Sequence, residues 1–210
     1  YLAFGMKAQQ DPQYNLYQFN QMVINPAYAG ARDGISTIAS VRQQWAGFSG
    51  APRTICFSAH SPILDDKLGV GLTLVNDVLG PRNMNGVYAN VAYIMRLGQK
   101  FKLSMGINAG YNSFRFDFTD LNFKTTETNS QVYQNQKTGS LDLNGGAFLR
   151  SDKFFLGFSF THLYANDIYS FGDGSNTISY RLRTHFFLTF GRSFAINENC
   201  IFAPTIMIRN

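Results

Sequence analysis

Few residues of this sequence could do chemistry, and their spacing argues against catalysis. Ser58 and His60 stand two positions apart in the segment SAHSP, so on a strand both side chains would lie on one face. A hydrolase needs a base within hydrogen-bonding reach of its nucleophile and an acid that orients the base. No suitably placed acid accompanies this pair. We therefore predict a protein without enzymatic activity.

Metal and redox chemistry have equally little support. His60, His162 and His185 fall in three separate stretches of alternating sequence, so only the tertiary fold could bring them together as metal ligands. Cys56 and Cys200 belong to no C-x-x-C motif, and the predicted strand order places them far apart. We expect two free cysteines and neither a metal nor another cofactor.

Nucleotide and nucleic-acid binding are also disfavoured. Gly69-x-Gly71 is not followed by the helix that a phosphate-binding loop requires. Glycines inside a strand more often let another segment approach the sheet closely. The net charge of +5 permits nucleic-acid binding, but the Lys and Arg residues are scattered and form no basic patch.

The composition favours strands with one apolar face. Aromatic residues make up 15% of the chain and charged residues only 15%, against about 25% charged in ordinary soluble domains. There are 19 glycines, and the mean hydropathy is −0.14. No apolar run approaches the ~20 residues of a membrane helix. If this protein lies in a membrane, it crosses with strands.

Apolar and polar residues alternate along most of the chain. In 101–112, Phe101, Met105 and Tyr111 share one face, whereas small and amide side chains share the other. The pattern predicts about nine strands, at 34–44, 53–60, 67–76, 86–97, 101–112, 139–150, 153–163, 177–193 and 199–209. These lengths exceed the usual 5–6 residues and suit tilted membrane strands of ~9–11.

The connections between these strands alternate in length. The predicted short ones are 61–66, 98–100, 151–152 and 194–198, and the predicted long ones are 45–52, 77–85, 113–138 and 164–176. Short turns on one rim and long loops on the other are typical of outer-membrane barrels. The predicted fold is therefore an all-β, antiparallel transmembrane outer-membrane β-barrel, with a soluble β-sandwich as the alternative.

The sequence predicts three parts. Residues 1–8 have the apolar, small-residue character of a residual signal peptide, although an ordinary N-terminal strand is the alternative. Residues 9–33 form a periplasmic, pre-barrel segment, and residues 34–210 form the barrel. Bacterial barrels have an even number of strands, so nine suggests an incomplete chain whose C-terminal strands are missing. A miscounted strand is the other explanation.

Three ordered segments carry a resemblance to a known family. They are QDPQYNLYQFNQMVINPAYAGARDG at 10–34, RQQWAGFSGAPRTICFSAHSPI at 42–63 and LGVGLTLVNDVLGP at 68–81. Together they resemble the start of mature PorP/SprF proteins, outer-membrane components of the Bacteroidetes type IX secretion system. The rest of the chain matches that family only in general character.

The resemblance implies a function as well as a fold. It implies a non-enzymatic barrel of the bacterial outer membrane that assists secretion and surface anchoring of adhesin-like cargo, with a link to gliding motility. The implied partners are the C-terminal domain of a secreted adhesin or other cargo, other type IX secretion components and outer-membrane lipid. A passive porin or small-molecule transport barrel is the alternative.

Two groups of residues are candidate functional elements. The first is a rigid turn that would clamp the pre-barrel segment to the barrel mouth: Asn25, Pro26, Ala27, Tyr28, Ala29 and Gly30. The many large apolar residues in 10–30 predict that this segment packs against the barrel.

The second group is a basic ladder, Arg181, Arg183 and His185, on the expected eighth strand. Arginine facing lipid costs roughly 2–4 kcal/mol at the bilayer midplane, so this face should point into the lumen and Leu182 should face outward. Asp142 or an acidic cargo segment would then neutralise the ladder. We expect the remaining lumenal arginines, Arg42, Arg96 and Arg150, to pair with Asp77, Asp142 and other lumenal acids.

Overall fold

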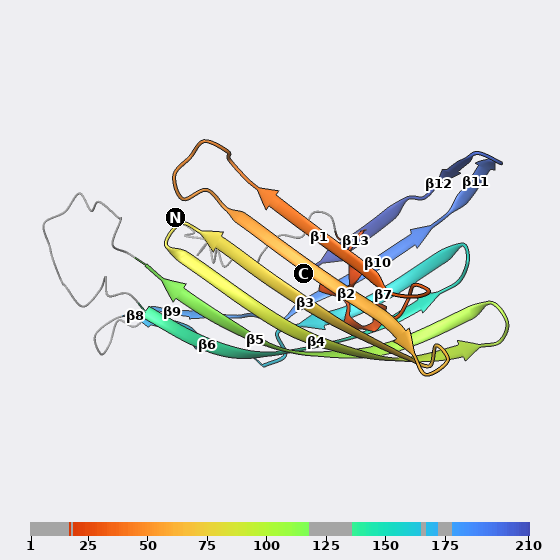
Figure 1. Cartoon of the computed structure of the whole chain (residues 1–210), viewed down its shortest axis with the longest axis horizontal. Coiled ribbons are helices and arrows are strands. Elements are labelled where there is room, and N and C mark those ends of the chain that lie inside the picture. The colour runs from red at the N-terminus through yellow and green to blue at the C-terminus, as the bar shows by residue number, and fades with distance from the viewer. Residues whose placement is uncertain (1–16, 18, 118–135, 165–166, 172–177) are drawn as a thin grey trace, which may run out of the picture.

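The computed structural model describes residues 17, 19–117, 136–164, 167–171 and 178–210. Nearly all of them lie in or between strands of one antiparallel sheet, which curls into a half-barrel (Figure 1). The predicted fold class is confirmed, because the sheet has the antiparallel, curled form of a membrane β-barrel. No helix among the described residues is long and apolar enough to cross a membrane.

The sheet has nine strands in the order β1-β2-β3-β4-β5-β6-β7-β10-β13. Their bounds are β1 Ser36–Gln43, β2 Arg53–Ile63, β3 Leu68–Leu79, β4 Arg82–Leu97, β5 Phe101–Phe116, β6 Gln136–Arg150, β7 Phe154–Thr161, β10 His185–Arg192 and β13 Thr205–Arg209. Two short hairpins are added, one from β8 Asp167–Phe171 and β9 Ile178–Arg181, the other from β11 Phe194–Asn197 and β12 Cys200–Phe202.

The two faces of the sheet differ as the alternation predicts. On β5, Ser104 and Asn112 are buried on the concave side, which we call the inner face. Ile107 and Tyr111 on the same strand are 70% and 53% exposed on the opposite, convex side, which we call the outer face. An apolar, outward surface of this kind is what lipid accommodates.

The connections define two rims. The turn rim carries 64–67, 98–100, 151–153 and the β11–β12 hairpin, and the loop rim carries 44–52. One predicted long loop, 77–85, is wrong: β3 and β4 pair up to Leu79 and Arg82, so only a tight turn remains. The predicted loop 164–176 contains β8. Of the longest predicted loop, residues 118–135 lie outside the described part of the chain.

The expected eighth strand, 177–193, is two strands rather than one. β9 pairs with β8, residues 182–184 leave the sheet, and β10 then pairs with β7 and β13. This break shifts the alternation, so the prediction that Leu182 faces outward is wrong. Leu182 is buried against an inner-face cluster that includes Cys56 and Phe114.

An N-terminal segment, residues 19–31, occupies the inner face of the half-barrel (Figure 1). We call it the plug. It consists of two short 3₁₀ turns, η1 Gln21–Val23 and η2 Pro26–Tyr28. Met22 and Ile24 are almost fully buried, so this part of the expected packing of 10–30 is confirmed. The predicted signal peptide, residues 1–8, lies outside the described residues.

Candidate functional site: the plug and its seat

A row of small residues crosses the inner face at one level of the sheet. Strand register places its members side by side on β3, β4, β5, β6 and β7: Gly69, Ala92, Gly106, Gly146 and Ser159. We call this set the small-residue row. Because these side chains are small, the main chain of another segment can pack directly against the sheet along this row. We call this surface the seat of the plug.

The main chain of the plug lies directly on this row. A Cβ atom added to Gly106 would stand 2.5 Å from both N and Cα of Ala27. A Cβ added to Gly69 would meet the carbonyl of Ala29, and one added to Gly71 would meet the sulfur of Met22. The expectation that Gly69 and Gly71 admit a close approach is therefore confirmed.

Asn25 anchors the plug to two strands. Its Oδ1 accepts a hydrogen bond from the N–H two residues later (3.0 Å) and so caps η2. Its Nδ2 donates to the carbonyls of Ala147 on β6 (3.0 Å) and Phe158 on β7 (3.4 Å). Nearby, the Ser159 hydroxyl donates to the carbonyl of Ile24 over 2.6 Å. The Asn25 side chain and the main-chain carbonyl of Ile24 thus bond the plug to β6 and β7.

Ser58 and His60, the pair that resembled a catalytic couple, hold the plug instead. The Ser58 hydroxyl donates to Asn20 Oδ1 over 2.9 Å. His60 Nδ1 accepts from the N–H of Gly30 over 3.2 Å, where Gly30 has a φ of +70° that favours glycine. Both side chains therefore have structural partners in the plug.

Tyr28 packs in the middle of this contact. Its ring lies edge-on to His60 (5.5 Å between ring centroids) and to Phe148 on β6 (5.2 Å). Its hydroxyl accepts from Nε of Arg32 over 3.2 Å. Edge-to-face pairs of this kind contribute about 0.5–1.5 kcal/mol beyond burial alone. The one aromatic residue of NPAYAG thus joins β2 to β6 through the plug.

Every residue of the predicted clamp, 25–30, lies in this interface, and Ala27 and Ala29 have no exposed surface. Sequence reasoning missed Asn20, Gly106 and Ser159. The repeated small residues at polar-face positions of consecutive predicted strands were the signal that could have found Gly106 and Ser159. For Asn20 the sequence offers no comparable signal.

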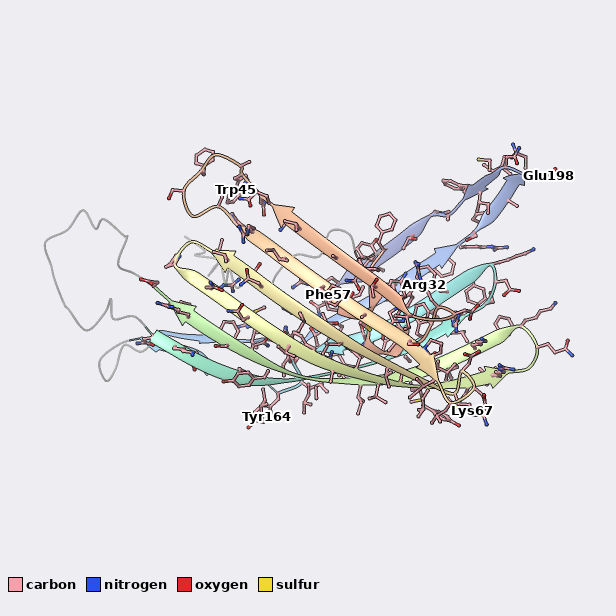
Figure 2. The ribbon with its side chains drawn as sticks, viewed as in Figure 1. Arg32, Trp45, Phe57, Lys67, Tyr164 and Glu198 are labelled. Atoms are coloured by element: carbon pink, nitrogen blue, oxygen red, sulfur yellow. The ribbon has the colours of Figure 1, made fainter. Side chains whose placement is uncertain are left out.

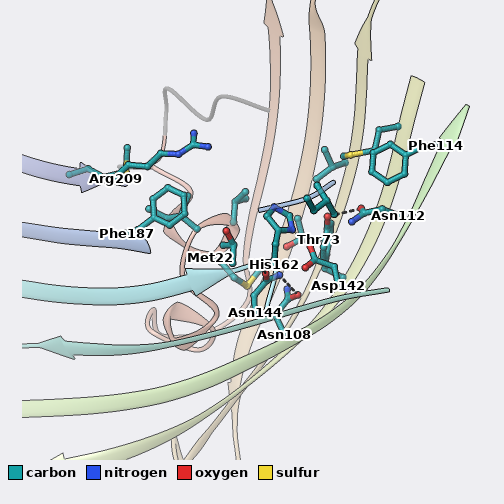
Figure 3. A pocket seen from close by; sticks show the side chains of 18 of the residues that line it. Met22, Thr73, Asn108, Asn112, Phe114, Asp142, Asn144, His162, Phe187 and Arg209 are labelled. Carbon is teal, nitrogen blue, oxygen red and sulfur yellow. Dashed lines mark hydrogen bonds and ion pairs between the residues drawn. The ribbon is translucent and has the colours of Figure 1, made fainter. Parts of the chain in front are cut away.

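Between the plug and the loop rim the structure leaves a cavity of about 90 Å³ (Figure 3). Its wall includes an amide ladder. Asn108 Nδ2 donates to Asn90 Oδ1 (2.7 Å), and Asn144 Nδ2 donates to Asn108 Oδ1 (3.0 Å). The N–H of His162 then donates to Asn144 Oδ1 (2.8 Å). Hydrogen bonds thus continue between side chains across β4, β5 and β6 and end at the main-chain N–H of the residue after β7.

The lumenal carboxylates have other partners than expected. Asp142, 1% exposed, has Oδ2 2.9 Å from His162 Nδ1. Asp77 pairs with Arg82 at 2.6 Å and accepts from the Thr54 hydroxyl. Asp77 therefore pairs with an arginine other than those expected, and Arg96 lies 3.9 Å from Asp66 instead.

The basic ladder is divided by the break after β9. Arg181 ends β9, and its side chain lies outside what the structure describes. Arg183 is exposed, while His185 is half-buried at the start of β10 with Nδ1 2.9 Å from the carbonyl of Asn210. The three residues therefore do not belong to one uninterrupted strand. Their role in partner binding stays a prediction.

Other candidate chemistry finds no assembled site in the described part of the chain. No group of three His, Cys, Asp or Glu residues there is arranged to hold a metal ion. Cys56 and Cys200 are both free, as predicted, one buried on the inner face and the other exposed on β12. Trp45 is 65% exposed on the loop between β1 and β2 (Figure 2).

Comparison with family models yields one match. The model described as "Type IX secretion system membrane protein PorP/SprF" covers residues 6–210, which is almost the whole chain. Comparison with curated proteins and with solved structures finds no match.

Proposed function

Because the chain belongs to the PorP/SprF family of type IX secretion system membrane proteins, we propose that it anchors and helps to export cargo at the bacterial outer membrane. In this proposal the barrel acts without enzymatic chemistry and binds the C-terminal domain of an adhesin or similar cargo. The same activity would serve gliding motility where the cargo is a motility adhesin. Family membership also implies contact with other type IX secretion components.

The plug is the observation that favours this role over that of a passive porin. A porin needs a continuous water-filled lumen. Here residues 19–31 rest on β2 to β7 through buried side chains and hydrogen bonds, so this part of the inner face is filled by the chain itself. An inner face that is already occupied suits a protein that holds a partner.

The loop rim is the side on which cargo would bind. In bacterial barrels the longer loops face the cell exterior and the short turns face the periplasm. Leu182, in the connection from β9 to β10, packs in one cluster with Met84 and Phe116 near the loop-rim ends of β4 and β5, and exposed Arg183 follows it. Arginine recognises carboxylates through paired hydrogen bonds, so an acidic segment of the cargo domain is the matching partner.

Surface attachment of cargo in cells tests the proposal. We expect R181E/R183E to reduce the amount of cargo held at the cell surface, with the barrel itself present at normal levels. The matched control is R53E/R115E, which reverses two exposed cations elsewhere on the loop rim. Unchanged attachment in R181E/R183E would remove the two arginines from the binding site, and normal attachment in cells lacking the barrel would refute the function.

Planar-bilayer conductance separates this role from the porin alternative. We expect the full-length protein to show no large, stable channels, because the plug blocks the inner face. Large open channels in the wild-type protein would favour passive transport.

A further inference from the structure

A second candidate site lies on the opposite rim, outside the lumen. At the turn rim, a hollow of about 590 Å³ opens beside the ends of β5, β7 and β10. Its lining includes three cations and three aromatic rings: Lys100, Lys153, Arg192, Phe101, Phe154 and Phe190. The plug and the cargo proposal use none of these residues.

The cations come from separate elements that the backbone holds together. Lys100 lies in the β4–β5 turn, Lys153 in the β6–β7 turn and Arg192 at the end of β10. The N–H of Ser193 donates to the carbonyl of Lys153 over 2.7 Å, which ties the β6–β7 turn to the end of β10. The turns lie close together at the right of Figure 1. The fold therefore gathers cations that are up to 92 positions apart in the sequence.

The charge of these cations is little offset by the part of the chain that the structure describes. Among the described residues, Lys100, Lys153 and Arg192 form no ion pair, and Asp152 is the one carboxylate in the lining. The guanidinium of Arg192 lies over the ring of Phe194 (4.9 Å), which leaves its charge in place. At the β2–β3 turn, by contrast, Arg96 has Asp66 at 3.9 Å. The hollow thus keeps an excess of positive charge that suits an anion.

The aromatic residues place this charge at the edge of the membrane. The rings of Phe101 and Phe154 lie 5.9 Å apart, and both strands continue from there as the apolar outer face. Register pairs Phe190 with Leu156, which is 40% exposed on the same face. Aromatic girdles mark the two interfaces of a barrel with the lipid headgroups. The ligand should therefore have an anionic head and an apolar body.

We propose that this hollow binds the phosphate headgroup of an anionic glycerophospholipid, whose acyl chains lie along the outer face of β5, β7 and β10. The turn rim of a bacterial barrel faces the periplasm, so the lipid belongs to the inner leaflet of the outer membrane. The inference rests on the membrane placement of the barrel and not on cargo binding. Absence of lipid binding together with normal cargo attachment would therefore overturn the lipid proposal and leave the cargo proposal standing.

Lipid titration of the purified full-length protein tests the inference. Native mass spectrometry from detergent would count bound phosphatidylglycerol, phosphatidylcholine and inorganic phosphate. We expect one preferred phosphatidylglycerol, with phosphatidylcholine and phosphate bound far more weakly. One cation at an anionic lipid surface strengthens binding roughly fivefold, so K100Q/K153Q/R192Q should lose affinity on the order of 100-fold.

A matched variant controls for net charge. R53Q/R115Q/K137Q removes three exposed cations from the loop rim and should keep the wild-type affinity for phosphatidylglycerol. Equal affinity in wild type and K100Q/K153Q/R192Q would overturn the proposal, as would equal losses in the two triple variants. Phosphate binding as tightly as the lipid would show an anion site without a lipid ligand and would also overturn it. All substituted residues are exposed, so both variants should fold.

Discussion

Substituting Gly106 with alanine should loosen the plug without disturbing the sheet. The added Cβ would stand 2.5 Å from N and Cα of Ala27 and 2.6 Å from the carbonyl carbon of Pro26. Ordinary contacts between carbon atoms lie at about 3.5–4.0 Å, so the plug must move by about 1 Å. These are main-chain atoms, which no side-chain rotation can withdraw. Forced overpacking of this kind typically costs 1–3 kcal/mol.

This cost destabilises the docked state of the plug, so a larger fraction of molecules has the plug undocked. A loss of about 1–3 kcal/mol raises the undocked fraction by roughly 5- to 150-fold. Hydrogen–deuterium exchange of peptides covering residues 19–31 reports this fraction, because their amides are protected only while docked. We expect exchange to accelerate by that factor in G106A, with the amides of β4 and β5 unchanged.

The control is the glycine on the opposite face of the neighbouring strand. A Cβ on Gly145 would meet only the ring of Phe160 at 2.6 Å, which can rotate away on the outer face. G145A should therefore leave exchange of the plug at the wild-type rate. If G106A exchanges no faster than wild type, or if the two variants behave alike, the small-residue row is not the seat of the plug.

Three further changes probe single interactions. S159A removes the hydroxyl that donates to the plug over 2.6 Å, and it should raise plug exchange by the equivalent of about 1 kcal/mol, with strand amides as the internal reference. D77N removes the carboxylate that lies 2.6 Å from buried Arg82 and should cost about 1.5–3 kcal/mol, seen as a lower thermal midpoint that D77N/R82Q partly restores. L182A should cost about 2–5 kcal/mol because Leu182 is only 6% exposed, whereas L188A on the outer face should cost clearly less in the same thermal melt; equal losses would contradict the inward position of Leu182.

The strands were predictable because the sheet separates two different environments. An outer face of large apolar side chains and an inner face of glycine and amides impose a period of two that local sequence displays directly, as in 101–112. The tight turn after Leu79 was missed because Asn76 and Asp77 look like loop residues. Both are strand residues whose polar groups are bonded within the sheet, Asp77 to Arg82 and Asn76 to Asn83.

The break after β9 and the depth of the plug depend on tertiary contacts. Locally, Leu182 fits an uninterrupted alternation, and only its burial against residues of β2 and β5 shows that the alternation shifts there. The turn chemistry of Asn25-Pro26 and Gly30 was readable from the sequence. The small residues on the polar face of each strand were readable too, but their alignment into one row was not, because it depends on the register of five strands that brings Gly69, Gly106 and Ser159 to one level.

The anchors of the plug also dictate an order of folding. Asn25 bonds to the carbonyls of Ala147 and Phe158, and Ile24 accepts from Ser159, so these contacts join residues 122 to 135 positions apart. The segment that is synthesised early can dock only after β6 and β7 have paired. Contacts between such distant residues are slow to form because the intervening chain must first be ordered. Docking of the plug is therefore a late step of folding, and exchange protection of residues 19–31 should appear after that of the β3–β5 strands.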